Sequence, residues 1–319
     1  MSRFLRIMLL NLISFEASAG VRNFSFGVTS SDLRPALSYI PESKKPSALL
    51  VVLHGGSRNA SLAMNQDSEY EWNQIAEAKG WVALYPSGTT NQKDSQKLLW
   101  NDCRLSFGTV GPIRPDVNDV VYLDALIKKV MREENLKEVF LTGHSNGAGL
   151  VYRMAMESSL RLTAIAPMLM TLPRNLARCK DGWHHPIPTA LLLGTLDPMV
   201  SFSGGTKGRS AADTLEWIRT KNEALSEGKT TSYDDINKSD GPNGTSSTIN
   251  RKSYESSDKT TNVEYFVVEG GGHQVPGPAP VEKWMVDWLG PKNRDLSIRQ
   301  EIASFFERQI QTTNKKHLP

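Results

Sequence analysis

The segment 143–147, with the sequence GHSNG, carries the strongest chemical signal in this chain of 319 residues. It has the form GxSxG and stands between an apolar segment and a segment with helical spacing. Such a strand-to-helix turn exposes a serine hydroxyl, and small residues on both sides avoid collisions where the backbone is strained. Free N–H groups at the start of the helix face the same point. We therefore predict that Ser145 is a nucleophile rather than part of an ordinary structural turn.

A serine hydroxyl needs a base that takes its proton and an acid that orients the base. In folds with this turn the acid and then the histidine follow the serine along the chain. Asp197 comes shortly after the apolar segment 190–193, and His273 follows another apolar segment and three glycines that permit a sharp loop. These positions predict a triad of Ser145, Asp197 and His273. The alternatives are an ordinary turn aspartate and a surface histidine.

An oxyanion hole requires backbone N–H donors aimed at the developing negative charge. The residue after the nucleophile supplies one donor, here Asn146, and the loop after an early strand supplies another. The sequence HGGS at residues 54–57 follows the apolar segment 48–53 and has the right place. We predict Gly56 as this second donor, although the sequence does not separate it from Gly55 or Ser57.

The segments that must position these loops alternate in character along the chain. Apolar segments typical of buried strands are separated by segments with helical spacing, which predicts an α/β fold with a mostly parallel central sheet flanked by helices. The segment 226–262 holds only four apolar or aromatic residues, so we expect it to be a polar, mobile excursion from the sheet. Because no linker leads to a second module, we expect residues 20–319 to form a single catalytic domain.

Residues 1–19 contain two arginines, a short apolar stretch and the sequence ASA, which is the pattern of a cleaved signal peptide. The apolar stretch is too short to span a bilayer, so we predict a secreted protein without a membrane partner. The chain has 37 basic and 34 acidic residues and no dense basic run, which argues against a nucleic-acid partner. Export also permits a disulfide between Cys103 and Cys179.

Two weaker patterns do not support a site. The glycine-rich segment 204–210 lacks the residue order of a phosphate-binding loop. Cys179, Asp181, His184 and His185 lie close together in the sequence but without the spacing of a zinc site. We therefore expect no metal and no cofactor.

The chain resembles the polyhydroxybutyrate depolymerase/feruloyl esterase family of secreted α/β-hydrolases, which is related to carbohydrate esterase family 1. The resemblance extends over about residues 34–310 and implies the α/β-hydrolase fold, with Ser145, Asp197 and His273 on the family's triad and Gly56 in its oxyanion loop. The matching motifs are LVVLHGG (50–56), GWVALYPSGT (80–89), WND (100–102), DVNDVVYLDALI (116–127), LTGHSNGAG (141–149), GTLDPMVSFSGG (194–205) and GGGHQVPG (270–277).

The triad and the resemblance together lead us to expect a secreted serine esterase that works through an acyl-enzyme and needs no protein partner. Extracellular polyester depolymerases of the family usually carry an extra polymer-binding domain. We expect none in this protein, which favours soluble feruloyl or acetyl esters of plant polysaccharide. Trp100 is a candidate for the acyl pocket, unless it is simply a core residue. The alternatives are a polyhydroxybutyrate depolymerase, a peptidase on the same fold, and a non-catalytic carbohydrate-binding relative.

Overall fold

The computed structural model describes residues 20–316, except for gaps at 68–69, 91–96, 105–115, 177–178, 180–181, 184, 258 and 260. The predicted signal peptide at residues 1–19 lies outside the described residues, as do Asp181 and His184. Within the described part of the chain, none of the helices combines the length and the apolar character needed to cross a membrane.

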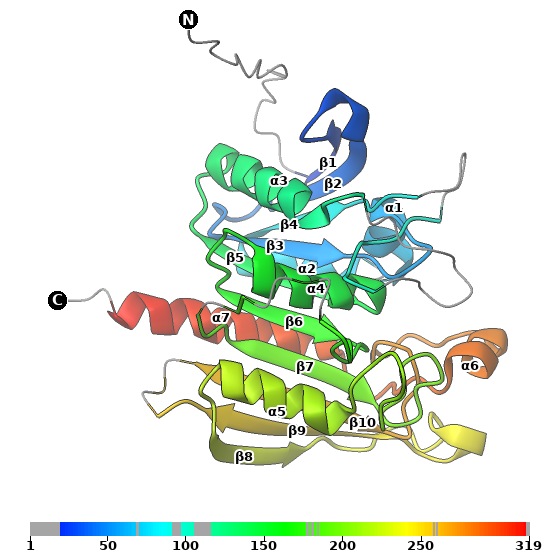
Figure 1. The fold of residues 1–319 in the computed structure, drawn as a ribbon. Coiled ribbons are helices and arrows are strands. Elements are labelled where there is room, and N and C mark those ends of the chain that lie inside the picture. Colours follow the sequence, from blue (N-terminus) through cyan, green and yellow to red (C-terminus); the bar gives the residue numbers. More distant parts are fainter. Residues whose placement is uncertain are drawn as a thin grey trace, which may run out of the picture.

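Ten strands form one sheet in the order β1-β2-β4-β3-β5-β6-β7-β10-β9-β8 (Figure 1). The six strands from β4 to β10 in this order are parallel, and the outer pairs are antiparallel. This arrangement confirms the predicted α/β class with a mostly parallel central sheet. The strands are β1 (Gly20–Phe26), β2 (Arg34–Ile40), β3 (Ala48–Leu53), β4 (Trp81–Pro86), β5 (Glu138–His144), β6 (Ala164–Met168), β7 (Thr189–Gly194), β8 (Ser226–Ser232), β9 (Thr248–Glu255) and β10 (Asn262–Glu269).

Helices cover both faces of the sheet (Figure 1). The first layer contains α3 (Asp119–Glu133), α4 (Asn146–Glu157) and α5 (Ala211–Lys221), and the second contains α2 (Glu71–Lys79) and α7 (Ile298–Lys316). Each layer packs its own hydrophobic cluster against the sheet, so the central strands are buried on both faces and are continuously apolar. The short elements are α1 (Ala60–Leu62), α6 (Lys283–Leu289), and the one-turn helices Ser30–Asp32, Ala63–Asp67 and Pro242–Gly244.

The polar segment 226–262 differs from our expectation, because two parts of it lie in the sheet and only the connection 233–247 between them leaves it. These two parts form β8 and β9, which extend the sheet beyond β10 by antiparallel pairing. Six of the seven residues of β8 are exposed, so this edge strand is held mainly by main-chain hydrogen bonds. The prediction of an excursion is wrong for these two strands, because main-chain pairing at a solvated edge needs few apolar side chains.

Candidate active site

The predicted site residues lie on four loops at one edge of the sheet. Gly56 follows β3, Ser145 follows β5, Asp197 follows β7 and His273 follows β10. These four strands are parallel, and the carboxyl ends of parallel strands meet at the same edge. The sheet therefore gathers loops that are more than 200 residues apart in the sequence.

Ser145 occupies a sharp turn between β5 and α4. Its backbone has φ 54° and ψ −118°, a strained conformation for a residue with a side chain, and its N–H donates to the carbonyl oxygen of Met168 at 2.9 Å. A Cβ atom on Gly147 would lie 2.5 Å from the carbonyl oxygens of Leu53 and His54. Only glycine at this position allows the turn to pack directly against the end of β3.

His273 and Asp197 form a buried pair. The Nδ1 atom of His273 lies 2.6 Å from Oδ2 of Asp197, and both side chains are almost inaccessible. The other carboxylate oxygen, Oδ1, accepts the N–H groups of Met199 and Val200, each at 2.8 Å. Both oxygens of the carboxylate are thus hydrogen-bonded. Because Nδ1 of the imidazole faces the carboxylate, the Nε2 atom is available to a reacting group.

The loop that carries His273 is hydrogen-bonded to the last residue of α6 and to the segment that follows this helix. The N–H of His273 donates to the carbonyl oxygen of Leu289 at 2.6 Å, and the N–H of Gly272 donates to that of Pro291 at 2.7 Å. A Cβ atom on Gly272 would lie 2.2 Å from the Leu289 carbonyl oxygen. Glycine is therefore required where the histidine loop passes the end of α6.

His144 links three of the four loops. Its ring centroid lies 5.1 Å from that of His273, and a Cβ atom on Gly55 would lie 3.1 Å from its Nδ1 atom. Burial, together with the charge of a protonated His273, holds the pKa of His144 well below its usual range. The neighbour of Ser145 is therefore an uncharged ring packed against His273 and the oxyanion loop.

His54 fixes the loop after β3. Its Nε2 atom accepts the N–H of Gly88 at 2.9 Å, so the proton resides on Nδ1, which donates to the carbonyl oxygen of Gly55 at 2.7 Å. Burial lowers the pKa of His54 to about 4. This neutral imidazole fastens the oxyanion loop to the loop after β4.

The structure narrows the choice of oxyanion donor in this loop. The N–H of Ser57 donates to the carbonyl oxygen of Leu98 at 2.9 Å and is therefore occupied. Among the described residues, no hydrogen bond engages the N–H of Gly55, Gly56 or Asn146. The predicted donors Gly56 and Asn146 keep their N–H groups available, and Gly55 remains the alternative to Gly56.

A side-chain network beneath the site was not anticipated from the sequence. The side-chain Oδ1 of Asn146 accepts a hydrogen bond from the backbone N–H of Trp100 at 2.8 Å. The Nδ2 group of Asn146 donates to Oδ2 of Asp102 at 2.7 Å. The indole N–H of Trp100 donates to the carbonyl oxygen of His54 at 3.0 Å. Trp100 is completely buried, so its observed contacts join the serine turn to the oxyanion loop, while its contact with substrate stays a prediction. The WND motif was the available signal for this network.

Comparisons with known proteins place this geometry in context. No family model matches the sequence. The bifunctional acetylxylan esterase/xylanase XynS20E of Neocallimastix patriciarum is 23% identical over 259 residues, which cover 78% of this chain and 33% of that protein. The chain therefore spans about a third of the length of this curated relative.

Among solved structures, the acetyl xylan esterase from Aspergillus awamori matches with a TM-score of 0.54 and 14% identity over 85% of this chain and 99% of that one. This chain has the α/β-hydrolase fold. The poly(3-hydroxybutyrate) depolymerase LpqC from Bordetella parapertussis matches with a TM-score of 0.44 and 17% identity, over 64% of this chain and 80% of that one. The acetylxylan esterase named among the curated relatives agrees with the resemblance found in the sequence motifs.

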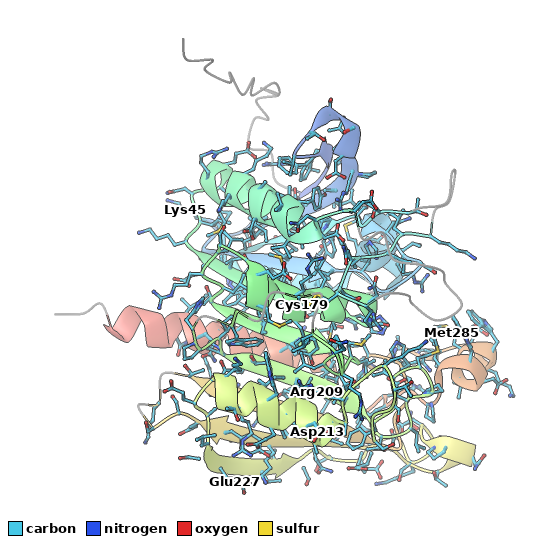
Figure 2. The ribbon with its side chains drawn as sticks, in the orientation of Figure 1. Lys45, Cys179, Arg209, Asp213, Glu227 and Met285 are labelled. Atoms are coloured by element: carbon cyan, nitrogen blue, oxygen red, sulfur yellow. A yellow bond between two sulfur atoms is a disulfide. The ribbon has the colours of Figure 1, made fainter. Side chains whose placement is uncertain are left out.

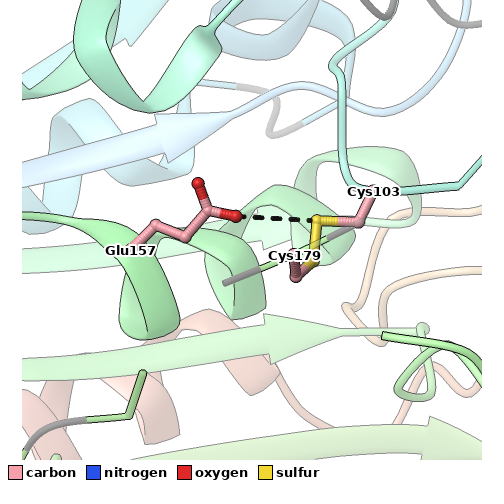
Figure 3. A group of neighbouring side chains, drawn as sticks. All are labelled: Cys103, Glu157 and Cys179. Carbon is pink, nitrogen blue, oxygen red and sulfur yellow. Dashed lines mark hydrogen bonds between the residues drawn. A yellow bond between two sulfur atoms is a disulfide. The ribbon is translucent and has the colours of Figure 1, made fainter. Parts of the chain in front are cut away.

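A disulfide ties the hydrolase fold together next to the WND segment. Cys103 and Cys179 are bonded, with Cα atoms 5.5 Å apart, and Oε1 of Glu157 lies 4.0 Å from the Cys103 sulfur (Figure 3). Arg153, one turn earlier on α4, pairs with Glu157 at 3.1 Å and donates to the carbonyl oxygen of Asn101 at 2.7 Å. The two sulfurs and Glu157 are close enough to hold a metal ion, but bonded sulfurs are not the thiolates that bind metals.

A cavity of about 450 Å³ lies along α5 and contains none of the predicted site residues. Arg209 and Asp213, labelled in Figure 2, mark its position at the start of this helix. It combines guanidinium groups, carboxylates and an indole. Its lining residues are Arg174, Arg209, Asp213, Glu216, Trp217 and Thr220.

Proposed function

We propose that this chain is a serine carboxylic ester hydrolase with Ser145 as nucleophile, His273 as general base and Asp197 as its orienting acid. The observation that carries the proposal is the buried 2.6 Å contact between His273 and Asp197 at the edge of the sheet where Ser145 occupies its strained turn. This order of acid and histidine after the serine is that of α/β-hydrolases.

The reaction follows from these positions. The Ser145 Oγ attacks the ester carbonyl carbon while Nε2 of His273 takes the hydroxyl proton. The tetrahedral intermediate collapses to an acyl-serine as His273 returns the proton to the departing alcohol oxygen. His273 then deprotonates a water molecule, whose oxygen attacks the acyl carbon. As the acyl–Oγ bond breaks, His273 returns this proton to the Ser145 oxygen, which releases the carboxylic acid and restores the free enzyme. Asp197 keeps the imidazole in the required tautomer and stabilises the imidazolium.

The negative charge of the intermediate is stabilised by backbone N–H groups. Asn146 is the first residue of α4, so its N–H lies at the helix N-terminus, where the positive end of the helix dipole favours a negative charge. Gly56 supplies the second N–H from the loop that His54 holds in place. Burial of Ser145 and His273 strengthens these interactions because little water screens them.

Acetyl or feruloyl esters of plant polysaccharide are the proposed substrates. The motif resemblance and the acetylxylan esterase named among the relatives support this class. The proposed site of action is outside the cytoplasm, which the disulfide and the signal-like residues 1–19 support because disulfides persist in oxidising compartments.

Replacement of the nucleophile tests the proposed reaction. We expect Ser145→Ala to lower kcat on p-nitrophenyl acetate by about a thousandfold or more, since the acyl-enzyme can no longer form. Ser203→Ala, at an exposed serine in another loop, is the matched control and should hydrolyse the ester at the wild-type rate. If wild-type protein leaves the ester intact, or Ser145→Ala hydrolyses it equally fast, the proposed function is rejected.

A substrate panel tests the proposed ester class. Release of acetate from acetylated xylan, or of ferulate from methyl ferulate, is the expected result. Clearing of a polyhydroxybutyrate film without action on either of these esters would instead assign a polyester depolymerase.

A further inference from the structure

Two tryptophans stand exposed on α6. Trp284 and Trp288 have exposed fractions of 60% and 59%, and none of the seven residues of this helix is buried. They are four residues apart, so they share one face of the helix with about 6 Å between them along its axis. A soluble protein seldom leaves two large neighbouring indoles in water unless they contact a ligand or partner.

The helix that carries the tryptophans ends beside the proposed site. Leu289, the last residue of α6, accepts the N–H of His273, and Figure 2 shows Met285 of the same helix at the end of the molecule where the parallel strands terminate. A Cβ atom on Gly290, which ends α6, would lie 3.2 Å from the carbonyl oxygen of Leu196. Leu196 is 49% exposed and directly precedes Asp197. The C-terminal end of α6, directly after Trp288, and the loop of the acid therefore adjoin.

The chemistry around the rings suits a neutral, hydroxyl-rich ligand. Lys283 and Asp287 form an exposed ion pair at 2.7 Å on the same helix and offer hydrogen-bond donors and acceptors beside the indoles. An indole face packs against the apolar C–H face of a pyranose ring, and polar groups at its border can bind the hydroxyls. The nearly balanced charge does not suit nucleic acid or an anionic membrane, which require clustered basic residues.

We propose that Trp284 and Trp288 form a platform for the sugar chain of a polysaccharide ester. This platform rests on the proposed esterase function and gives it a polymeric carbohydrate as substrate. The main chain lies across the two indoles of α6, and an acyl group on a neighbouring sugar enters the site of Ser145. The leucine before Asp197 extends the apolar surface toward that site.

Binding is measured with protein that cannot turn over its substrate. In a Ser145→Ala background, we expect the additional change of Trp284 and Trp288 to alanine to weaken binding of soluble xylan by about tenfold in affinity electrophoresis. Replacement of both by phenylalanine keeps an aromatic face and should retain part of the affinity. Leu225→Ala is the matched control, because Leu225 is 60% exposed and directly precedes β8. It lies at the end of the sheet where the parallel strands begin, opposite the proposed site.

Turnover gives a second measurement in the active protein. For the double alanine variant, the ratio of the rate on acetylated xylan to the rate on p-nitrophenyl acetate should fall by about tenfold. The platform is overturned if Ser145→Ala protein binds xylan equally well with and without the two tryptophans. It is also overturned if the double alanine change weakens only adsorption on polyhydroxybutyrate film. Failure of the esterase function would appear separately, as absence of p-nitrophenyl acetate hydrolysis, and tryptophan-dependent xylan binding would then still support the platform.

Discussion

At the scale of single residues, the site contains three histidines with different surroundings. His273 contacts a carboxylate, whereas His54 and His144 face backbone groups and rings in buried positions. Because burial disfavours the imidazolium, His54 and His144 remain neutral and act as fixed spacers between loops. Of these three, only His273 contacts a carboxylate, which orients its ring as the proposed general base.

The pKa of His54 predicts a pH-dependent stability. An unfolded histidine has a pKa of about 6.5, whereas folding lowers that of His54 to about 4, so the unfolded chain binds more protons between these values. The contribution of His54 is therefore fully present above pH 6.5 and is lost as the pH falls toward 4.

The unfolding free energy of the wild type should fall as the pH is lowered from 7 to 4.5. In His54→Gln we expect this fall to be smaller by about 2 kcal/mol. Glutamine can accept the Gly88 N–H and donate to the Gly55 carbonyl without gaining a charge. Urea unfolding at the two pH values measures this difference. An unchanged pH dependence in the variant would show that His54 titrates normally in the folded protein.

At the scale of elements, the start of α4 is packed directly on the end of β3. The contact exists because residue 147 lacks a Cβ, and it sets the distance between the serine turn and the oxyanion loop. The Asn146 side chain reinforces this contact, because it accepts a hydrogen bond from the backbone N–H of Trp100. The indole N–H of Trp100 in turn donates to the carbonyl oxygen of His54. Two elements separated by more than 90 residues thus form one rigid unit.

Substitution of Gly147 by alanine tests this unit. Its Cβ would lie 2.5 Å from two carbonyl oxygens, so we expect a loss of about 1–3 kcal/mol in stability and about a hundredfold in kcat on p-nitrophenyl acetate. Gly205→Ala is the control, because an added Cβ there meets no atom within 4 Å. Wild-type kinetics in Gly147→Ala would mean that the spacing of the two loops does not limit the reaction.

At the scale of the whole molecule, one disulfide joins the segment between β4 and α3 to the segment between β6 and β7. Cys103 precedes α3 and Cys179 follows β6, so the bond closes a loop of 76 residues that contains the serine turn. The bonded Cys103 also immediately follows Asp102, the acceptor of the Asn146 side chain. The crosslink therefore restrains both the unfolded chain and the support of the site.

We expect replacement of both cysteines by serine to lower the unfolding free energy by about 4 kcal/mol and Tm by roughly 5–10 °C, because loop-closure entropy is restored to the unfolded chain. Differential scanning fluorimetry with and without dithiothreitol measures the change. Reductant should lower the Tm of the wild type and leave that of the double serine variant unchanged. A wild-type Tm that does not respond to full reduction would contradict the prediction.

The sequence alone was enough to predict the class of fold and to place the candidate residues after strands of the parallel sheet. The central strands are buried on both faces, so they are continuously apolar and can be recognised locally, and residues that follow parallel strands necessarily share an edge. Ser145, Asp197 and His273 could be selected for this reason, and β3 ends where its apolar segment ends.

Other features depended on contacts that no local pattern records. The seven-residue α6 has no buried face and β8 is almost wholly exposed, so neither has a hydrophobic period. The hydrogen bond from Ser57 to Leu98 removed one candidate oxyanion donor, and the hydrogen bond from His273 to Leu289 placed the end of α6 against the histidine loop. Local side-chain pattern determined which elements form, whereas long-range packing decided which N–H groups stay free and which elements contact the candidate site residues.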